Sequence, residues 1–295
     1  MFSLNRRTVG EAAFDWVNNL LMLIICFATL YPIWNVLVNA FNDGTDAMRG
    51  GIYWWPRQFS LDNFKTVFES NGIMTAMGVT VAKTVVGTVV HVLFTAMVAY
   101  AYSRRELIGR TVYMVIGTIT MLFPGALIPT FLLIRDLGMI DHFSVYIIPA
   151  LFSFFDLIIF LSFFREIPDG LIEAAEIDGA GDFTVLFRIV LPVSMPVVAT
   201  IALFHGVYQW NDYFTGMIYI NNTDLQPIQT FLFRVVAQAS SNQMISAMPS
   251  GVATNVTSQS LKLATMIVTT APIVIVYPFL QRYFVRGFMI GSIKG

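Results

Sequence analysis

Five ionisable side chains lie inside strongly apolar stretches of the sequence, where such groups are costly and usually functional. They are Lys83, His91, Asp156, His205 and Asp212. Groups of this kind face a water-filled cavity or pair with another polar group, and a set of His and Asp could also relay protons. The chain has no nucleophile–base arrangement and no His-Glu-x-x-His metal spacing, so the sequence does not favour an enzyme or a metal site.

Aromatic and amide side chains gather around the last of these groups. The consecutive residues are Tyr208, Gln209, Trp210, Asn211 and Asp212. Sugars are held by ring stacking and by amide and carboxylate hydrogen bonds, so the run suits a substrate pathway for a sugar. It suits interhelical hydrogen bonding equally well, because polar side chains provide that in helix bundles.

Two further observations bear on such a pathway. Asp156, with Ser153, could line the same cavity from a neighbouring apolar segment. An anionic sugar would prefer cations, and Lys83 and His91 are the candidates within the apolar segments.

A second candidate segment, from Ile167 to Pro192, joins two apolar stretches. Asp169 is placed to cap a short helix, and Gly179 supplies a left-handed stop at its end. Asp182 is placed to cap a second short helix, and Pro192 to start the next apolar one. The sequence therefore predicts a helix, a sharp turn and a helix.

This predicted joint presents small side chains beside charged ones. The small residues are Ala174, Ala175, Gly179 and Ala180, and the charged ones are Glu173 and Asp178. A short rigid helix with such a face can seat in a groove of another protein. The alternative is an acidic connecting loop with no partner.

The composition shows what must position these residues. Of 295 residues, 56% are hydrophobic and 12% charged, and the mean hydropathy is +0.70. A soluble domain carries roughly 25% charged residues, so the chain is predicted to be an integral membrane protein. The net charge of −1 shows no basic excess for nucleic acid. Cys26 is the one cysteine, which excludes an intramolecular disulfide.

Six segments are apolar over about 20 residues, the length that spans a bilayer. They cover 18–41, 73–103, 110–134, 144–164, 193–220 and 261–284. All six are predicted to be helices, because lipid leaves no partner for unpaired backbone groups. We expect one transmembrane domain over 1–295, a retained first span, outer loops at 42–72 and 221–260, and an inner loop at 165–192.

Lys and Arg in the connections set the orientation. With the first residue inside, the inner side holds ten of them: Arg6, Arg7, Arg104, Arg105, Arg110, Arg165, Arg188, Arg282, Arg286 and Lys294. The outer side holds five: Arg49, Arg57, Lys65, Arg135 and Arg234. This bias predicts that both termini are cytoplasmic.

The inner loop resembles the "EAA loop" of ABC importer permeases. The matching positions are Glu173-Ala174-Ala175, Gly179, Ile189 and Leu191-Pro192. The resemblance implies a type I importer permease fold with six transmembrane helices, whose loop is a coupling helix docked in an ATPase cleft. It assigns coupling to Glu173, Ala174, Ala175, Asp178, Gly179, Ala180 and Pro192.

Other stretches resemble the carbohydrate class of these permeases, in the branch of the maltose permease's smaller membrane subunit. They are residues 99–105, 123–130, 137–141 and 210–214. The ending 281–295 is similar to a sub-branch linked to uronate fragments, such as alginate oligosaccharides. The resemblance therefore implies oligosaccharide import.

No Gly-x-x-x-x-Gly-Lys-Ser/Thr phosphate loop occurs, so ATP and Mg²⁺ are expected on partner subunits, with no cofactor on this chain. The family implies a second homologous permease subunit, two ATPase subunits and an extracytoplasmic solute-binding protein, in a bacterial cytoplasmic (inner) membrane.

The resemblance also implies roles for two outlying segments. Loop 221–260 would touch the binding protein, and the tail Ser292, Ile293, Lys294 and Gly295 would reach toward the ATPases. The competing function is an ion- or proton-coupled secondary transporter that uses Asp156, Asp212, His91 and His205 as its relay.

Overall fold

A computed structural model describes residues 9–69, 71–123, 125–245 and 257–291. The described residues are mostly helical, and they contain no β-strand beyond an isolated bridge between Asn42 and Phe59. The chain divides into two compact units. One comprises Met1–Glu69 with Val235–Val268, and the other Ser70–Arg234 with Thr269–Gly295.

The first unit is built on α1 (Val9–Ala40), a long helix whose side chains are apolar and largely exposed. Such a surface suits lipid or another membrane helix. Two short helices follow, α2 (Gly44–Ala47) and α3 (Asp62–Glu69). The unit also takes in the end of α13 (Ile228–Ile245) and the start of α14 (Ser258–Gly291).

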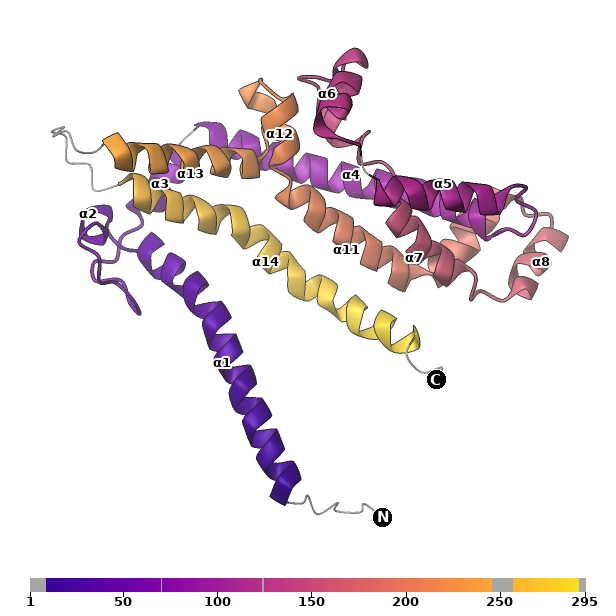
Figure 1. Cartoon of the computed structure of the whole chain (residues 1–295), viewed down its shortest axis with the longest axis horizontal. Helices are drawn as coiled ribbons and strands as arrows, with labels where there is room; N and C mark the ends of the chain where they lie inside the picture. Colours follow the sequence, from indigo (N-terminus) through magenta and orange to yellow (C-terminus); the bar gives the residue numbers. More distant parts are fainter. Residues whose placement is uncertain (1–8, 70, 124, 246–256, 292–295) are drawn as a thin grey trace. The chain divides into compact units, whose positions relative to one another are not determined.

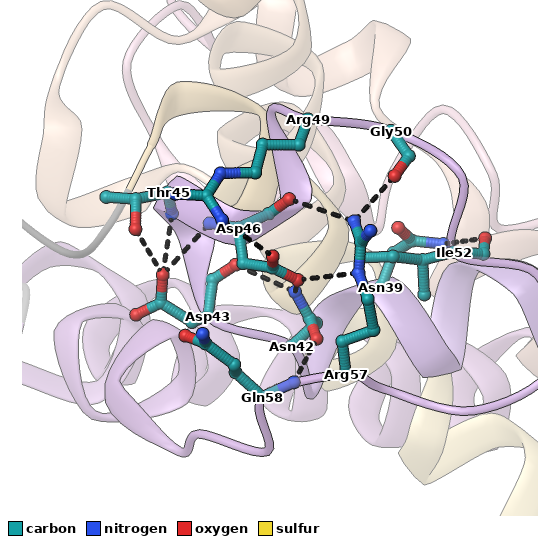
Figure 2. Close-up of polar contacts among 10 residues, drawn as sticks. All are labelled: Asn39, Asn42, Asp43, Thr45, Asp46, Arg49, Gly50, Ile52, Arg57 and Gln58. Carbon is teal, nitrogen blue, oxygen red and sulfur yellow. Dashed lines mark hydrogen bonds and ion pairs between the residues drawn. The ribbon is translucent and has the colours of Figure 1, made fainter.

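Polar contacts fix the predicted outer loop that follows α1 (Figure 2). The Asp43 carboxylate caps α2 by accepting from the Thr45 and Asp46 amides, and the Thr45 hydroxyl bond lowers the Asp43 pKa. The buried Asp46 carboxylate accepts from Arg57 Nε at 3.1 Å and from Asn42 Nδ2 at 3.0 Å. These bonds satisfy a buried charge, so the loop has a defined structure.

The second unit is organised around α4 (Asn71–Ser103), which packs most extensively against α11 (Met195–Asn211) and α7 (Phe154–Phe164). Figure 1 shows α4 and α11 side by side. Small residues on α4 permit close packing, and the apolar core between the three helices includes Ala96, Ala99, Leu157, Phe160 and Ile201.

Two turns of this unit are joined by Asp141, whose backbone has a φ of 59°. Its carboxylate accepts from the amides of Asn221 and Asn222, the latter at 2.9 Å. The Asn222 and Asn221 backbone bonds lower the pKa of Asp141. The contact holds the turn after α6 (Leu127–Asp136) beside η3 (Thr223–Leu225).

Three of the described helices are long and apolar enough to cross a membrane: Ala13–Ala40, Gly72–Ser103 and Ser258–Val276. Two bent pairs bring the number to five: α5 (Arg110–Leu122) with α6, and the Asp182–Val193 segment with α11. The predicted count of six is thus not reproduced helix by helix.

The prediction of one continuous helix over 144–164 is wrong. A 3₁₀ turn covers Phe143–Tyr146, and α7 begins only at Phe154. Pro149 lies in the gap and has no N–H to donate to a helical ladder. The predicted helix 193–220 is likewise broken, between α11 and α12 (Phe214–Tyr219).

Gly117 on α5 provides a test of how α5 packs against α7. A Cβ there would overlap the ring of the buried Phe154 on α7. We expect Gly117→Ala to cost about 1–3 kcal/mol through overpacking, measured as a lower thermal unfolding midpoint in detergent. Gly78→Ala is the control, because nothing lies within 4 Å of its Cβ position. Equal midpoints for the two variants would contradict the α5–α7 contact.

Candidate functional site

The inner loop contains the predicted joint. Helix α8 (Asp169–Ile177) is followed by a turn and then by α9 (Asp182–Val185). Gly179 has a φ of 83° and donates to Glu176 O at 3.0 Å, while Ala180 N–H donates to Ala175 O at 2.9 Å. These two bonds form a Schellman motif, and they confirm Gly179 as the left-handed stop.

The capping predictions for this loop are wrong. The N-cap residues are Pro168 and Gly181, neither with a side-chain cap bond, and the two helices begin at Asp169 and Asp182 themselves. The acidic side chains still lie at the positive helix ends, where they are favoured. Pro192 lies in α10 (Leu191–Val193), after the π-helical turn η2 (Leu186–Val190), while the long helix α11 begins at Met195 after an 85° bend.

Two ion pairs tie α8 to the segment that follows α4. Arg104 pairs with Glu176, and Arg105 Nη2 lies 2.6 Å from Asp169 Oδ2. Each exposed pair contributes only about 0–1 kcal/mol, so together they orient α8 more than they stabilise it. The sequence did not indicate this arrangement, because Arg104 and Arg105 contributed only to the topology count and to the resemblance of residues 99–105. Their partners on the loop are 72 and 64 residues away in sequence.

Several apolar side chains of this loop are exposed. Leu171 is 45% exposed, Ile177 86% and Phe183 70%. Ala174 lies between the first two at helical spacing and is also exposed, whereas Ala175 and Ala180 pack against the apolar core. Exposed apolar residues of this kind mark an interaction surface. Sequence periodicity could have identified Leu171 and Ile177, because they share a helix face with Ala174.

The remaining predicted coupling residues are also exposed. Glu173, Asp178 and Gly179 are exposed, and so is Pro192. Glu173 also lines a hollow of about 620 Å³ between α8 and the end of α4, together with Arg104 and Arg105. The coupling role of these residues stays a prediction.

The intramembrane ionisable groups form two separate contacts. In the first, His91 Nε2 on α4 lies 2.9 Å from Asp156 Oδ2 on α7, and its Nδ1 lies 2.9 Å from Ala150 O. A carbonyl only accepts, so Nδ1 carries a proton. The bond to Asp156 then needs a second proton, on either the imidazole or the carboxyl group. The pair is therefore neutral overall, which suits its burial.

His205 on α11 completes this cluster. Its ring stacks on the His91 ring at a centroid distance of 3.8 Å and an interplanar angle of 9°. The potential ligand atoms of His91, Asp156 and His205 lie within 4.8 Å of one another. Imidazole binds a metal in its ring plane, and nearly parallel planes do not meet at one ion. The observed geometry suits stacking and hydrogen bonding rather than metal ligation.

The second contact joins Lys83 to Asp212. Lys83 is 0% exposed, and its Nζ lies 2.9 Å from Asp212 O and 3.3 Å from Asp212 Oδ2. An ammonium so engaged is not free to receive an anionic sugar. His91 is likewise engaged with Asp156, so neither predicted cation faces an open cavity here.

The run 208–212 divides between two surfaces. Tyr208 and Asn211 are exposed and line a hollow of about 380 Å³ with Asp212, at the break between α11 and α12. Gln209 is buried and donates to Tyr146 O at 2.9 Å, and Trp210 is buried and donates to Thr269 O at 3.2 Å. A pathway role for this run and for Asp156 stays a prediction. Among these residues, only Tyr208, Asn211 and Asp212 lie at the hollow.

Two predicted segments lie wholly or partly outside the described residues. They are the tail 292–295 and part of the outer loop 221–260, namely 246–256.

Comparison with known proteins identifies the family. Residues 2–290 match the binding-protein-dependent transport system inner membrane component family, and the chain belongs to it. Its members are transport subunits of the inner membrane, and the predicted all-helical importer-permease fold is confirmed.

Relatives cover nearly the whole chain. The polygalacturonan/rhamnogalacturonan transport system permease protein YtcP of Bacillus subtilis (strain 168) is 38% identical over 283 residues, covering 96% of this chain and 98% of that protein. The arabinooligosaccharides transport system permease protein AraQ of Halalkalibacterium halodurans is 28% identical, covering 95% of this chain and 97% of that one.

A solved structure supports the same assignment. A chain of a bacterial ABC transporter involved in the import of the acidic polysaccharide alginate superposes with a TM-score of 0.86 at 27% identity. The match covers 94% of this chain and 99% of that one. The predicted membership in the carbohydrate class of ABC importer permeases is thereby confirmed.

The His91–Asp156 pair yields a second prediction. His91→Leu strands a buried carboxylate, and we expect it to cost about 3–5 kcal/mol in the free energy of unfolding. Asp156→Asn should cost about 1 kcal/mol or less, because the amide can donate to Nε2 of a neutral His91. Thermal unfolding in detergent measures both variants. Equal losses would contradict the neutral His91–Asp156 pair.

Proposed function

We propose that this chain is one membrane half of an ATP-driven importer for oligosaccharides. ATPases on partner subunits move α8, the movement passes into the membrane helices, and the cavity opens alternately to the two sides. The observation that carries the proposal is the inner loop. A short rigid helix exposes an apolar face and is tied by ion pairs to the segment that follows α4.

The geometry of α8 supports the proposal that this helix is moved by the partner ATPases. Its C-terminus is fixed by two backbone bonds and a left-handed glycine, so the helix and the following turn move as one piece. Its exposed Leu171, Ala174 and Ile177 can enter a groove of the partner ATPase, so that the partner can move the helix and the turn together. Arg104 and Arg105 then pass displacement to α4, the helix at the centre of its unit.

The proposed cargo is an oligosaccharide that contains uronate. The Bacillus relative is named for polygalacturonan and rhamnogalacturonan, and the structural relative for alginate, all acidic polysaccharides. The family description supports a solute-binding protein as the donor of cargo. A second permease subunit, two ATPase subunits and cytoplasmic termini complete the proposed assembly.

The alternative of a proton-coupled carrier is not favoured. Its proposed relay needs His91, Asp156, His205 and Asp212 in one chain of proton transfers. Asp212 instead pairs with Lys83, apart from the histidine cluster. Membership in a binding-protein-dependent family points to ATP as the energy source.

The glycine pair of the inner loop provides the test. Gly179→Ala forces a side chain into a φ of 83°, which costs about 1–2 kcal/mol and moves the Schellman turn. Gly181→Ala is the control, because its φ is −78° and nothing lies within 4 Å of its Cβ position. The measurement is ATPase stimulation by the loaded binding protein, with the complex reconstituted in proteoliposomes.

We expect Gly179→Ala to lower stimulated ATPase activity and uptake of a galacturonate trimer, while Gly181→Ala retains both. Uptake that continues without ATP, or full coupling in Gly179→Ala, would contradict the proposal.

A further inference from the structure

The break between α11 and α12 is held from within the protein by a buried lysine. Helix α11 ends at Asn211, and α12 begins at Phe214. Backbone carbonyls at such a break lose their helical donors and need other partners. Lys83 Nζ supplies one by donating to Asp212 O at 2.9 Å. The Tyr213 carbonyl keeps its helical donor, the Met217 N–H at 3.0 Å, and also accepts from Thr230 Oγ1 at 2.9 Å.

The Asp212 side chain links the two sides of the same break. Its Oδ2 accepts from Lys83 at 3.3 Å, and its Oδ1 accepts from the Thr215 amide of α12 at 3.0 Å. Lys83 also lies over the Tyr146 ring, 4.9 Å from its centroid. One ammonium on α4 therefore fixes the end of α11 and, through Asp212, the start of α12.

A fully buried lysine is a costly way to stabilise a fold. Removing an ammonium from water is strongly unfavourable, and replacing a buried ion pair with apolar residues often leaves stability unchanged or higher. Packing of α4 against α11 therefore does not require a charge at position 83. The charge does give the break a specific geometry, because the ammonium donates to the Asp212 carbonyl and carboxylate and an apolar side chain could not.

The geometry of the break shapes the hollow between α11 and α12. Tyr208 is 58% exposed and Tyr213 40% exposed, and both line it with Asn211 and Asp212. Rings and an amide presented together suit a sugar. Lys83 also compensates the Asp212 carboxylate, so the hollow does not repel an anionic sugar.

We propose that Lys83 is a positioning residue for the cargo path: it sets the α11–α12 break so that Tyr208, Asn211 and Tyr213 meet the oligosaccharide. The proposal rests on the importer function proposed above. It assigns no direct sugar contact to Lys83, because its side chain is wholly buried.

The test uses a double variant that leaves no stranded charge. Lys83→Met with Asp212→Asn removes the ion pair, while the amide oxygen introduced at position 212 can still accept from the Thr215 N–H. Lys83→Arg keeps a charge and donors for both Asp212 acceptors. Lys65→Met is the control, because Lys65 is exposed and pairs with Glu69 only at 3.9 Å. All are studied in the complete reconstituted complex, with a galacturonate trimer as the probe.

We expect the double variant to assemble normally, keep its maximal ATPase stimulation and raise the KM for uptake about tenfold, as for one lost ordered hydrogen bond. Lys83→Arg and Lys65→Met should keep a KM near that of the native protein.

An unchanged KM in the double variant overturns the proposal, whether or not the yield of complex falls. So does a KM for Lys83→Arg as high as that of the double variant. If the native complex itself imports no trimer, the proposed cargo fails first, and that result is distinct from a failure at Lys83.

Discussion

Polar groups buried in an apolar environment must find partners inside the protein, and α4 is where this demand is greatest. The helix carries Lys83 and His91 into its packed interior, about two turns apart on one side. Water cannot solvate them there, so each takes a carboxylate from another segment: Asp212 beyond α11 for Lys83, and Asp156 on α7 for His91. These pairs fix the rotation and register of α4 against its neighbours, which apolar packing alone leaves less specific.

This constraint connects distant parts of the unit. The C-terminal end of α4 continues into Arg104 and Arg105, which orient α8. Its middle holds α7 through His91, and its N-terminal half holds the break beside α12 through Lys83. A displacement at the inner loop thus meets a helix that is held at several points along its length by polar contacts. The stacked histidines add a contact with α11 that tolerates little rotation, because the rings are nearly parallel.

The interruptions in the apolar segments follow from the same physics. Non-helical backbone within a membrane protein is tolerated where side chains replace the missing helical bonds. Around Ala150 the replacement comes from His91, and around Asp212 it comes from Lys83. The sequence contains a signal at each break, Pro149 at the first and Asp212 at the second. Neither residue alone showed that the chain would stop being helical there. That outcome required donors from α4 to be within reach.

The sequence by itself determined the membrane class, the helical fold and the glycine stop at Gly179. Each of these depends on composition or on short-range backbone geometry. Motif spacing in the inner loop also indicated the family. Tertiary structure alone decided which polar residues pair, because Lys83 and Asp212 are 129 residues apart and no local pattern joins them. It also divided the run 208–212 into exposed Tyr208 and Asn211 and buried Gln209 and Trp210, since the face that α11 turns toward α4 is set by packing.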